Sequence, residues 1–185
     1  MSDVAASPQV IGAGERRKDE IASVAGQISH LSNGGRAALR RAYLVHARAT
    51  EGIIVGLLHR AGVAEAGWRS ERAFARWRLL AHVAALLSGT AETAPHAPSR
   101  PFGRALHEAG YSENRLMRLT AARGPALVDQ IVRAARFLAQ AGAAPVDLHV
   151  VYNLASDDPA RAEAARLRIA RDYYAADHAS AGDTK

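Results

Sequence analysis

The chain has no cysteine among its 185 residues. This absence excludes disulfide bridges and thiolate metal sites, and it is compatible with a reducing compartment. No apolar run approaches the roughly 20 residues that a membrane-spanning helix needs, and no charged segment followed by an apolar stretch opens the chain. We therefore expect a soluble, cytoplasmic protein without membrane contacts.

Lysine is nearly absent as well, since it occurs only as Lys18 and Lys185. Lys and Arg together number 24 and give a formal net charge of +6, so almost all the basic charge is guanidinium. Guanidinium groups form forked hydrogen bonds with phosphate oxygens, and this excess favours a polyanionic partner such as nucleic acid. A basic surface that serves only solubility is the alternative.

The common catalytic and metal-binding motifs are missing too. The eight histidines form no HExxH pattern, no Walker-type loop or nucleophile elbow occurs, and the N-terminal VIGAG lacks the strand and helix of a dinucleotide site. His82 is expected to be a core histidine, and Asp157 with Asp158 a helix cap and its neighbour. We expect no enzymatic activity, no cofactor and no metal site.

Alanine is abundant and β-branched residues are few, which predicts an all-α fold. The pattern favours about eight or nine helices in two small bundles that share one core. Residues 1–15 and 179–185 are expected to be disordered tails around a helical domain of residues 16–178, whose lobes are joined by a mobile loop at 89–101. Helices are expected over residues 16–31, 35–47, 51–61, 70–88, 102–109, 113–122, 125–141, 146–155 and 158–176.

The last of these helices has apolar residues on two sides. Leu167, Ala170 and Tyr174 fall on one side, and Ile169 and Tyr173 fall on the other. This pattern predicts a helix that is packed on both sides.

One short stretch places four arginines in what is predicted to be a single helix. The segment GGRAALRRAYLVHAR, residues 34–48, contains Arg36, Arg40, Arg41 and Arg48, and no acidic residue follows until Glu51. A helix that needs only solubility usually mixes charges of both signs. This face therefore favours an anionic partner.

Three segments in order carry a resemblance to a known family. They are GGRAALRRA (34–42), FGRALHEAGYSENRLMRL (102–119) and APVDLHVVYNLASDDPARAEAARLRIARDYYAA (144–176). In this order and spacing they resemble the CasB family, the small subunit of the type I-E CRISPR surveillance complex Cascade. The resemblance covers about residues 20–177. The family often has tryptophan where this chain has Leu148-His149 and Leu154-Ala155.

The resemblance implies an all-helical, non-catalytic subunit for antiviral defence. Its partners would be the Cascade backbone and large subunits, the guide RNA, the target DNA and a second copy of the chain. Its role would be to stabilise the guide RNA–target DNA heteroduplex and the displaced strand, while base pairing reads the sequence.

The resemblance also indicates nucleic-acid-binding residues. Arg40 and Arg41 match the basic pair of the first motif, Arg115 the arginine of a serine-capped helix, and Arg136 the basic position of a long amphipathic helix. Arg72 matches less directly, because loop lengths before it differ. The full set is Arg36, Arg40, Arg41, Arg72, Arg115, Arg118, Arg133, Arg136 and Arg161.

Several of these arginines have a structural alternative, whereas Arg136 has no acidic residue on its own stripe at i,i+4 spacing toward the C-terminus. For Arg40 and Arg41 it is a solvated helix face, with one of them directed inward as a structural partner. Arg115 and Arg118 can pair with Glu113 or Glu108, and Arg133 with Asp129 at i,i+4. Arg166 and Arg171 are expected to be structural, and Tyr173 and Tyr174 core residues rather than base-stacking platforms.

Two other functions remain open from the residues. A free-standing helical DNA-binding or regulatory protein would need a recognition helix that reads base edges, but few Asn or Gln are placed to do so. A helical adaptor without a nucleic-acid role is the third alternative.

Overall fold

The structure of the chain, a computed structural model, describes residues 12–42, 48–89 and 94–182. Within these ranges the order of elements is α1 (Ala13–Ser29), α2 (Asn33–Arg41), α3 (Arg48–Arg60), a short 3-10 helix η1 (Glu65–Gly67), α4 (Glu71–Leu87), α5 (Phe102–Glu108), α6 (Glu113–Ala121), α7 (Gly124–Gln140), α8 (His149–Leu154) and α9 (Pro159–Gly182). The described ranges contain no strand, and the predicted all-α fold is confirmed. None of these helices has both the length and the apolar character to cross a bilayer.

The predicted helix positions agree with the structure, with differences at the ends. Helix covers residues 13–15 and 179–182, which the sequence analysis placed in the tails. Alanine-rich sequence without proline carries α9 through this region to Gly182. The remaining tail residues 1–11 and 183–185, the helical prediction over 43–47, and loop residues 90–93 lie outside the described residues.

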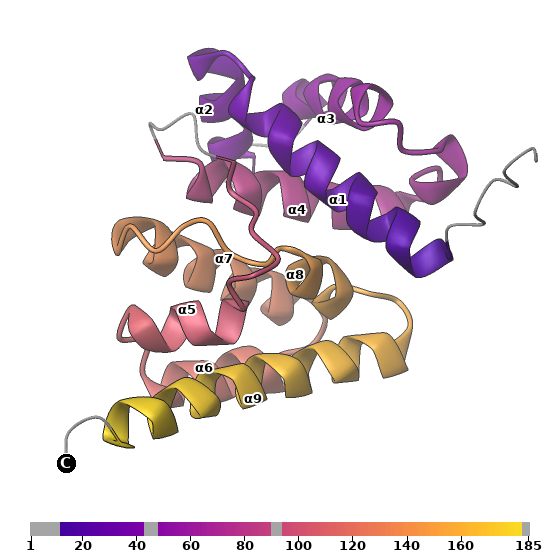
Figure 1. Ribbon diagram of the computed structural model, residues 1–185. Coiled ribbons are helices and arrows are strands. Elements are labelled where there is room, and N and C mark those ends of the chain that lie inside the picture. Colours follow the sequence, from indigo (N-terminus) through magenta and orange to yellow (C-terminus); the bar gives the residue numbers. More distant parts are fainter. Residues whose placement is uncertain (1–11, 43–47, 90–93, 183–185) are drawn as a thin grey trace, which may run out of the picture.

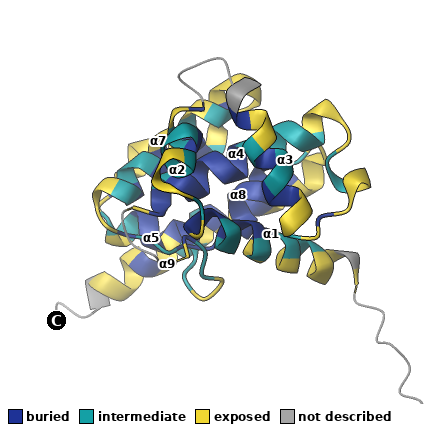
Figure 2. Cartoon of the chain, turned by 90° about the horizontal axis from the view of Figure 1, so that it is seen from above, coloured by how far each residue is buried: buried dark blue, intermediate teal, exposed yellow. Residues whose placement is uncertain are grey.

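The helices form two tiers (Figure 1). Helices α1 to α4 pack on one another in the upper tier, and α5 to α9 do so in the lower tier. Helix α4 joins the tiers, because it packs against both α7 and α8. Trp77 of α4, Ile131 of α7 and Tyr152 of α8 belong to one buried cluster, so the two bundles share one core. Figure 2 shows this core as the buried interior that α4 and α8 help to form.

The segment between α4 and α5 is held to the segment before α8. The amide of Ala97 donates to the Val146 carbonyl at 3.1 Å, and the Val146 amide donates to the Pro95 carbonyl at 3.2 Å. The Asp147 amide donates to the Arg100 carbonyl at 2.8 Å. Residues 95–100 are thus hydrogen-bonded to the lower tier, where the sequence analysis expected a mobile loop.

Helix α9 buries only one of its two apolar sides. Ile169 and Tyr173 are buried, whereas Leu167 is 69% exposed and Tyr174 is 36% exposed. The Tyr174 hydroxyl donates to the Glu113 carboxylate at 2.6 Å rather than entering the core. The prediction of packing on both sides is therefore wrong, as is the core assignment of Tyr174, because Leu167 and Tyr174 remain at the surface. The core assignment of Tyr173 is confirmed.

Candidate nucleic-acid interface

Helices α6 and α7 pack side by side and direct arginines away from the core. Leu116 and Leu119 of α6 are buried, as are Leu127, Ile131 and Leu138 of α7. Burial of these apolar stripes turns the opposite helix faces toward solvent. Each of those faces carries two arginines one turn apart: Arg115 and Arg118 on α6, and Arg133 and Arg136 on α7.

All four arginines line one cavity of about 370 Å³, which we call the arginine groove. Its lining residues are Tyr111, Arg115, Arg118, Gln130, Arg133, Arg136, Phe137 and Gln140. None of these residues is acidic, so the groove combines four positive charges with two neutral amides. Such an arrangement suits a chain of phosphates, which accept forked hydrogen bonds from guanidinium groups.

Two aromatic rings hold one of the arginines in place. The Arg115 guanidinium carbon lies 5.4 Å from the ring centroid of Phe137 and 5.9 Å from that of Tyr111, and the two rings meet edge to face at 5.2 Å. These cation–π contacts reduce the freedom of the Arg115 side chain before any ligand binds. Burial raises the pKa of Tyr111 against the lowering effect of Arg115, Arg118 and Arg133, so its phenol stays neutral at physiological pH.

None of the acidic partners suggested for the groove arginines forms an ion pair with them among the described residues. Glu113 accepts the Tyr174 hydroxyl, and Glu108 pairs with Arg100 at 3.2 Å and with Arg104 at 3.9 Å. Asp129 makes no ion pair with Arg133 among the described residues. The guanidinium groups of the groove are therefore not neutralised by described carboxylates.

Helix α2 gives its arginines three different environments. Arg36 donates to the Ser29 carbonyl at 2.8 Å and to the Asn33 side chain at 2.6 Å. Arg40 donates to the Ala85 carbonyl at 2.9 Å and also to the Gly89 carbonyl, both at the C-terminal end of α4. Arg41 is exposed and has no ion-pair partner among the described residues. Arg36 and Arg40 thus serve the fold, and Arg41 is available to a ligand.

The other two candidate arginines stand apart from the groove lining. Arg72 is exposed in the first turn of α4, and Arg161 lies 3.9 Å from Asp158 in the first turn of α9. The Asp158 carboxylate accepts the amides of Ala160 and Arg161, which confirms it as a helix cap.

Of the two arginines expected to be structural, Arg166 is confirmed, whereas Arg171 lies on the surface. Arg166 is 6% exposed and pairs with Glu163 at 3.4 Å, while Arg171 lies 3.9 Å from Asp172. Desolvation lowers the pKa of Arg166, and the nearby charge of Arg123 acts in the same direction.

His82 connects the end of α2 with the groove. Its buried Nδ1 lies 2.7 Å from the Leu39 carbonyl, which confirms the expected core histidine. Burial lowers the pKa of His82, the Leu39 hydrogen bond opposes this, and the charge of Arg136 lowers it further. The last turn of α2 and Arg136 are therefore both near His82. Both figures place α2 and α7 on the same side of the molecule (Figures 1 and 2).

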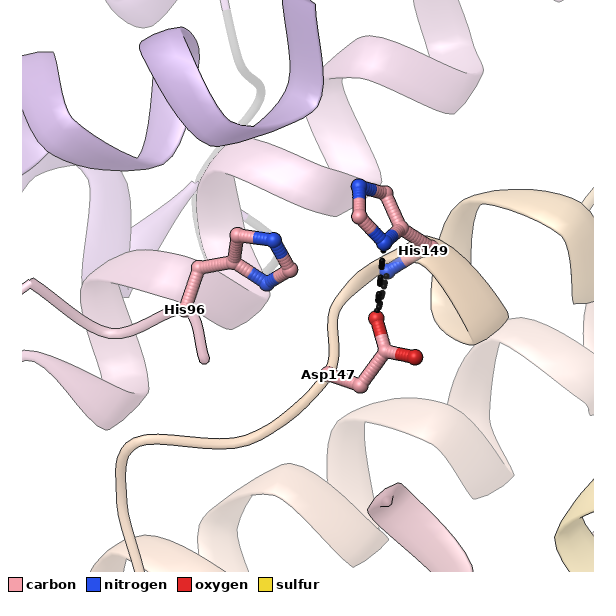
Figure 3. A group of neighbouring side chains, drawn as sticks. All are labelled: His96, Asp147 and His149. Carbon is pink, nitrogen blue, oxygen red and sulfur yellow. Dashed lines mark hydrogen bonds and ion pairs between the residues drawn. The ribbon is translucent and has the colours of Figure 1, made fainter. Parts of the chain in front are cut away.

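A second group of titratable side chains lies between the tiers (Figure 3). His96, Asp147 and His149 each offer a ligand atom within 4.8 Å of the other two, and they form the only such metal-ligating group in the described ranges. We call them the His–Asp–His cluster. Sequence analysis missed it because His96 is some fifty residues from the other two, although Asp147 and His149 do stand two positions apart.

Ion pairing sets the charge state of the cluster. Burial disfavours the charged form of Asp147, but hydrogen bonds from His149 and the charge of Arg168 outweigh it and lower its pKa. Burial also works against protonated His149, yet hydrogen bonds to Asp147 and the Lys18 carbonyl raise its pKa. Burial and the His149 charge lower the pKa of His96.

Comparison with protein-family models identifies the family of the chain. A family model described as CRISPR-associated protein Cse2 matches residues 35–174, which include most of α2, the arginine groove and most of α9. Comparison with curated proteins and with solved structures finds no match. Because the family model covers most of the chain, the chain belongs to the Cse2 (CasB) family, the small subunit of the type I-E CRISPR Cascade complex.

Proposed function

We propose that the arginine groove, together with exposed Arg41, holds nucleic-acid backbone in Cascade and thereby stabilises the guide RNA–target DNA heteroduplex and the displaced strand. Membership of the Cse2 family supports the setting, since the family is a non-catalytic Cascade subunit. It favours this function over a free-standing DNA-binding or regulatory protein. The second copy of the chain in the complex, the guide RNA and the target DNA are part of the same proposal.

The observation that carries the proposal is the convergence of four arginines from two helices on a cavity without a carboxylate. Arg118 and Arg133 are exposed, and Arg115 is held by aromatic rings. Contacts of this kind read charge and spacing rather than sequence, because phosphates are the same at every nucleotide. This fits a complex in which base pairing supplies sequence specificity.

The groove arginines would bind more effectively in an assembled complex than in the free chain, because the complex holds them close to the nucleic acid. A single chain offers only a few phosphate contacts, and its binding to free nucleic acid should be weak and sensitive to salt. Within an assembled complex the same contacts become intramolecular, and two tandem copies would add to one another. The groove would then stabilise a strand that base pairing has already opened.

The test is target binding by reconstituted Cascade that carries Arg118→Gln and Arg133→Gln. A charge-assisted contact at an exposed site contributes on the order of 1 kcal/mol, so target DNA binding should weaken roughly tenfold or more. The matched control carries Arg69→Gln and Arg171→Gln, which remove the same charge from exposed positions outside the groove. Equal binding by the groove variant, the control and the unaltered complex would refute the proposal, provided that all three assemble.

A further inference from the structure

We propose that the His–Asp–His cluster is a Zn²⁺ site, with three protein ligands and water in the fourth position, that fastens the linker between α4 and α5 to the segment before α8. It stands apart from the arginine groove and shares no residue with it. The sequence analysis expected no metal site. The cluster becomes visible only when the fold brings His96 against Asp147 and His149 (Figure 3).

The donor set matches the preference of zinc. Two imidazole nitrogens and one carboxylate oxygen are borderline ligands that suit Zn²⁺, whereas Mg²⁺ and Ca²⁺ select sites made of oxygen alone. Ligands at about 2.1 Å from a tetrahedral zinc lie about 3.4 Å apart. The Nδ1 atom of His149 is already 3.0 Å from the Asp147 carboxylate, and all three donors lie within 4.8 Å.

Surrounding groups orient two of the ligands. The Nε2 atom of His149 lies 3.2 Å from the Lys18 carbonyl, so a proton held there leaves Nδ1 for the metal. The second carboxylate oxygen of Asp147 accepts from Arg168 at 3.0 Å. The first oxygen accepts the His149 backbone amide at 2.9 Å, and its other lone pair, which faces His149 Nδ1, would bind the metal. Metal-ligating histidines almost always donate their other N–H in this way, because the bond fixes tautomer and ring direction.

His96 provides the third ligand. Its Nδ1 atom lies 3.3 Å from the Val146 carbonyl and 3.1 Å from the Leu148 amide, which hold the ring in place. Its Nε2 atom is buried and has no hydrogen-bond partner among the described residues. A buried polar nitrogen without a partner is costly. The Leu148 amide donates to His96 Nδ1, so the proton of the neutral ring lies on Nε2 in the metal-free state. Zinc binding at Nε2 would shift this proton to Nδ1, where the Val146 carbonyl at 3.3 Å would accept it in place of the Leu148 hydrogen bond.

Charge balance is met by release of a proton. In the metal-free cluster, a proton is shared between His149 Nδ1 and Asp147 at 3.0 Å. Zinc would replace that proton, so two neutral imidazoles and one carboxylate would bind Zn²⁺ and one proton would leave to buffer. Arg168 opposes the added charge, but it is partly exposed and also pairs with Asp172 at 3.6 Å.

The position of the cluster gives the site a structural role. His96 belongs to the linker between the tiers, His149 begins α8, and its ring reaches the Lys18 carbonyl of α1. A metal here would fix the upper tier against the lower one at a point that otherwise depends on hydrogen bonds. Unfolding of the tier junction would then require loss of the metal.

The test is titration of the tag-free full-length protein with ZnCl₂ by calorimetry, with Co²⁺ absorption spectra and thermal melts as further readouts. We expect one Zn²⁺ per chain, a rise in Tm, and visible d–d bands of tetrahedral Co²⁺. His96→Ala should weaken zinc binding about tenfold or more, since even loss of an outer partner costs that much. Asp147→Asn, which keeps the side-chain shape, should do the same.

The controls are His30→Ala and His178→Ala, which alter exposed histidines outside the cluster and should leave zinc affinity unchanged. The proposal is overturned if the unaltered protein binds no zinc. It is also overturned if folded His96→Ala and Asp147→Asn retain full affinity, or if a control variant abolishes binding. Circular dichroism establishes that each variant is folded, and the Co²⁺ spectrum of the unaltered protein reports on the site without any substitution.

Discussion

Gly103 of α5 lies so close to α9 that a Cβ atom at this position would be 2.1 Å from the carbonyl oxygen of Ile169. A second backbone atom, the amide nitrogen of Tyr173, would be 3.0 Å away. The backbones of the two helices thus touch, and only glycine permits the contact. This gives a physical reason for the glycine in the FGRAL motif that supported the family resemblance.

Gly103→Ala should therefore destabilise the protein. The clash is with helix backbone and cannot be relieved by moving a side chain, so we expect a loss at the upper end of the 1–3 kcal/mol that overpacking typically costs, roughly 3 kcal/mol. Urea denaturation at neutral pH measures the difference. Gly26→Ala in α1 is the control, because nothing lies within 4 Å of a Cβ there. It should be neutral or stabilising by up to about 1 kcal/mol, and equal stability of the two variants would contradict the packing argument.

Arg40 and Arg41 are adjacent in sequence but should behave differently. Arg40 donates to two carbonyls at the end of α4, and Arg40→Ala would leave both without their charged donor. We expect this variant to lose about 1–3 kcal/mol of unfolding free energy. Arg41→Ala should change it by less than about 0.5 kcal/mol, as is usual for an exposed side chain.

Nucleic-acid binding by the same two variants completes the comparison. Arg41→Ala should reduce binding at unchanged stability, because its side chain is exposed and lacks a described ion-pair partner. A destabilised Arg41→Ala would contradict the assignment of Arg41 to the ligand, and a fully stable Arg40→Ala would contradict the assignment of Arg40 to the fold.

His82 should make stability depend on pH in a defined direction. Its pKa is lower in the folded protein than the ordinary value of 6.5, chiefly because of burial. The unfolded chain therefore binds the proton more readily, and the stability associated with neutral His82 is fully present above pH 6.5. It is lost as the pH falls from 6.5 toward the lower folded pKa.

Replacement of this histidine isolates its contribution. His82→Asn keeps a side-chain donor near the Leu39 carbonyl but does not titrate in this range. On going from pH 7.5 to pH 5, the unfolding free energy should decrease less in the variant than in the unaltered protein. An identical pH dependence would show that His82 does not titrate on unfolding.

The sequence predicted the helices well because each carries a strong local signal. Ser70 caps α4 by accepting the Ala73 amide at 3.2 Å, and Pro125 lies in the first turn of α7 as its position suggests. The spacing of the apolar residues alone predicts which face of α7 buries Ile131. The ends were less certain, since alanine-rich sequence continues a helix without marking where it ends, as α9 shows.

The contacts of individual arginines could not be predicted from the sequence in the same way. A helical wheel places Arg40 and Arg41 on one polar face, yet only the tertiary contact with α4 decides which of them is engaged by the fold. The exposure of Leu167 has a similar origin, because an apolar stripe does not reveal whether a partner covers it. The His–Asp–His cluster depends on a pairing of distant segments, for which the sequence carries no local signal.

Convergence of the arginine groove was the part of the site that sequence and family resemblance anticipated best. Arg115, Arg118, Arg133 and Arg136 come from two separate segments, and the fold brings them to one cavity. Two amphipathic helices joined by a short turn must lie close together, so their polar faces can meet. Whether those faces hold nucleic acid is the central claim and is open to direct measurement.

That measurement is the salt dependence of binding to a fluorescent single-stranded oligonucleotide, made with the unaltered protein and with Arg115, Arg118, Arg133 and Arg136 all changed to glutamine. Removal of one arginine–phosphate interaction should lower the slope of log K against log salt concentration by about 0.7. We predict a slope lower by about 2 to 3 in the groove variant, and little change when Arg69 and Arg171 are changed instead. An unchanged slope in a folded groove variant would contradict the assignment of the groove to nucleic acid.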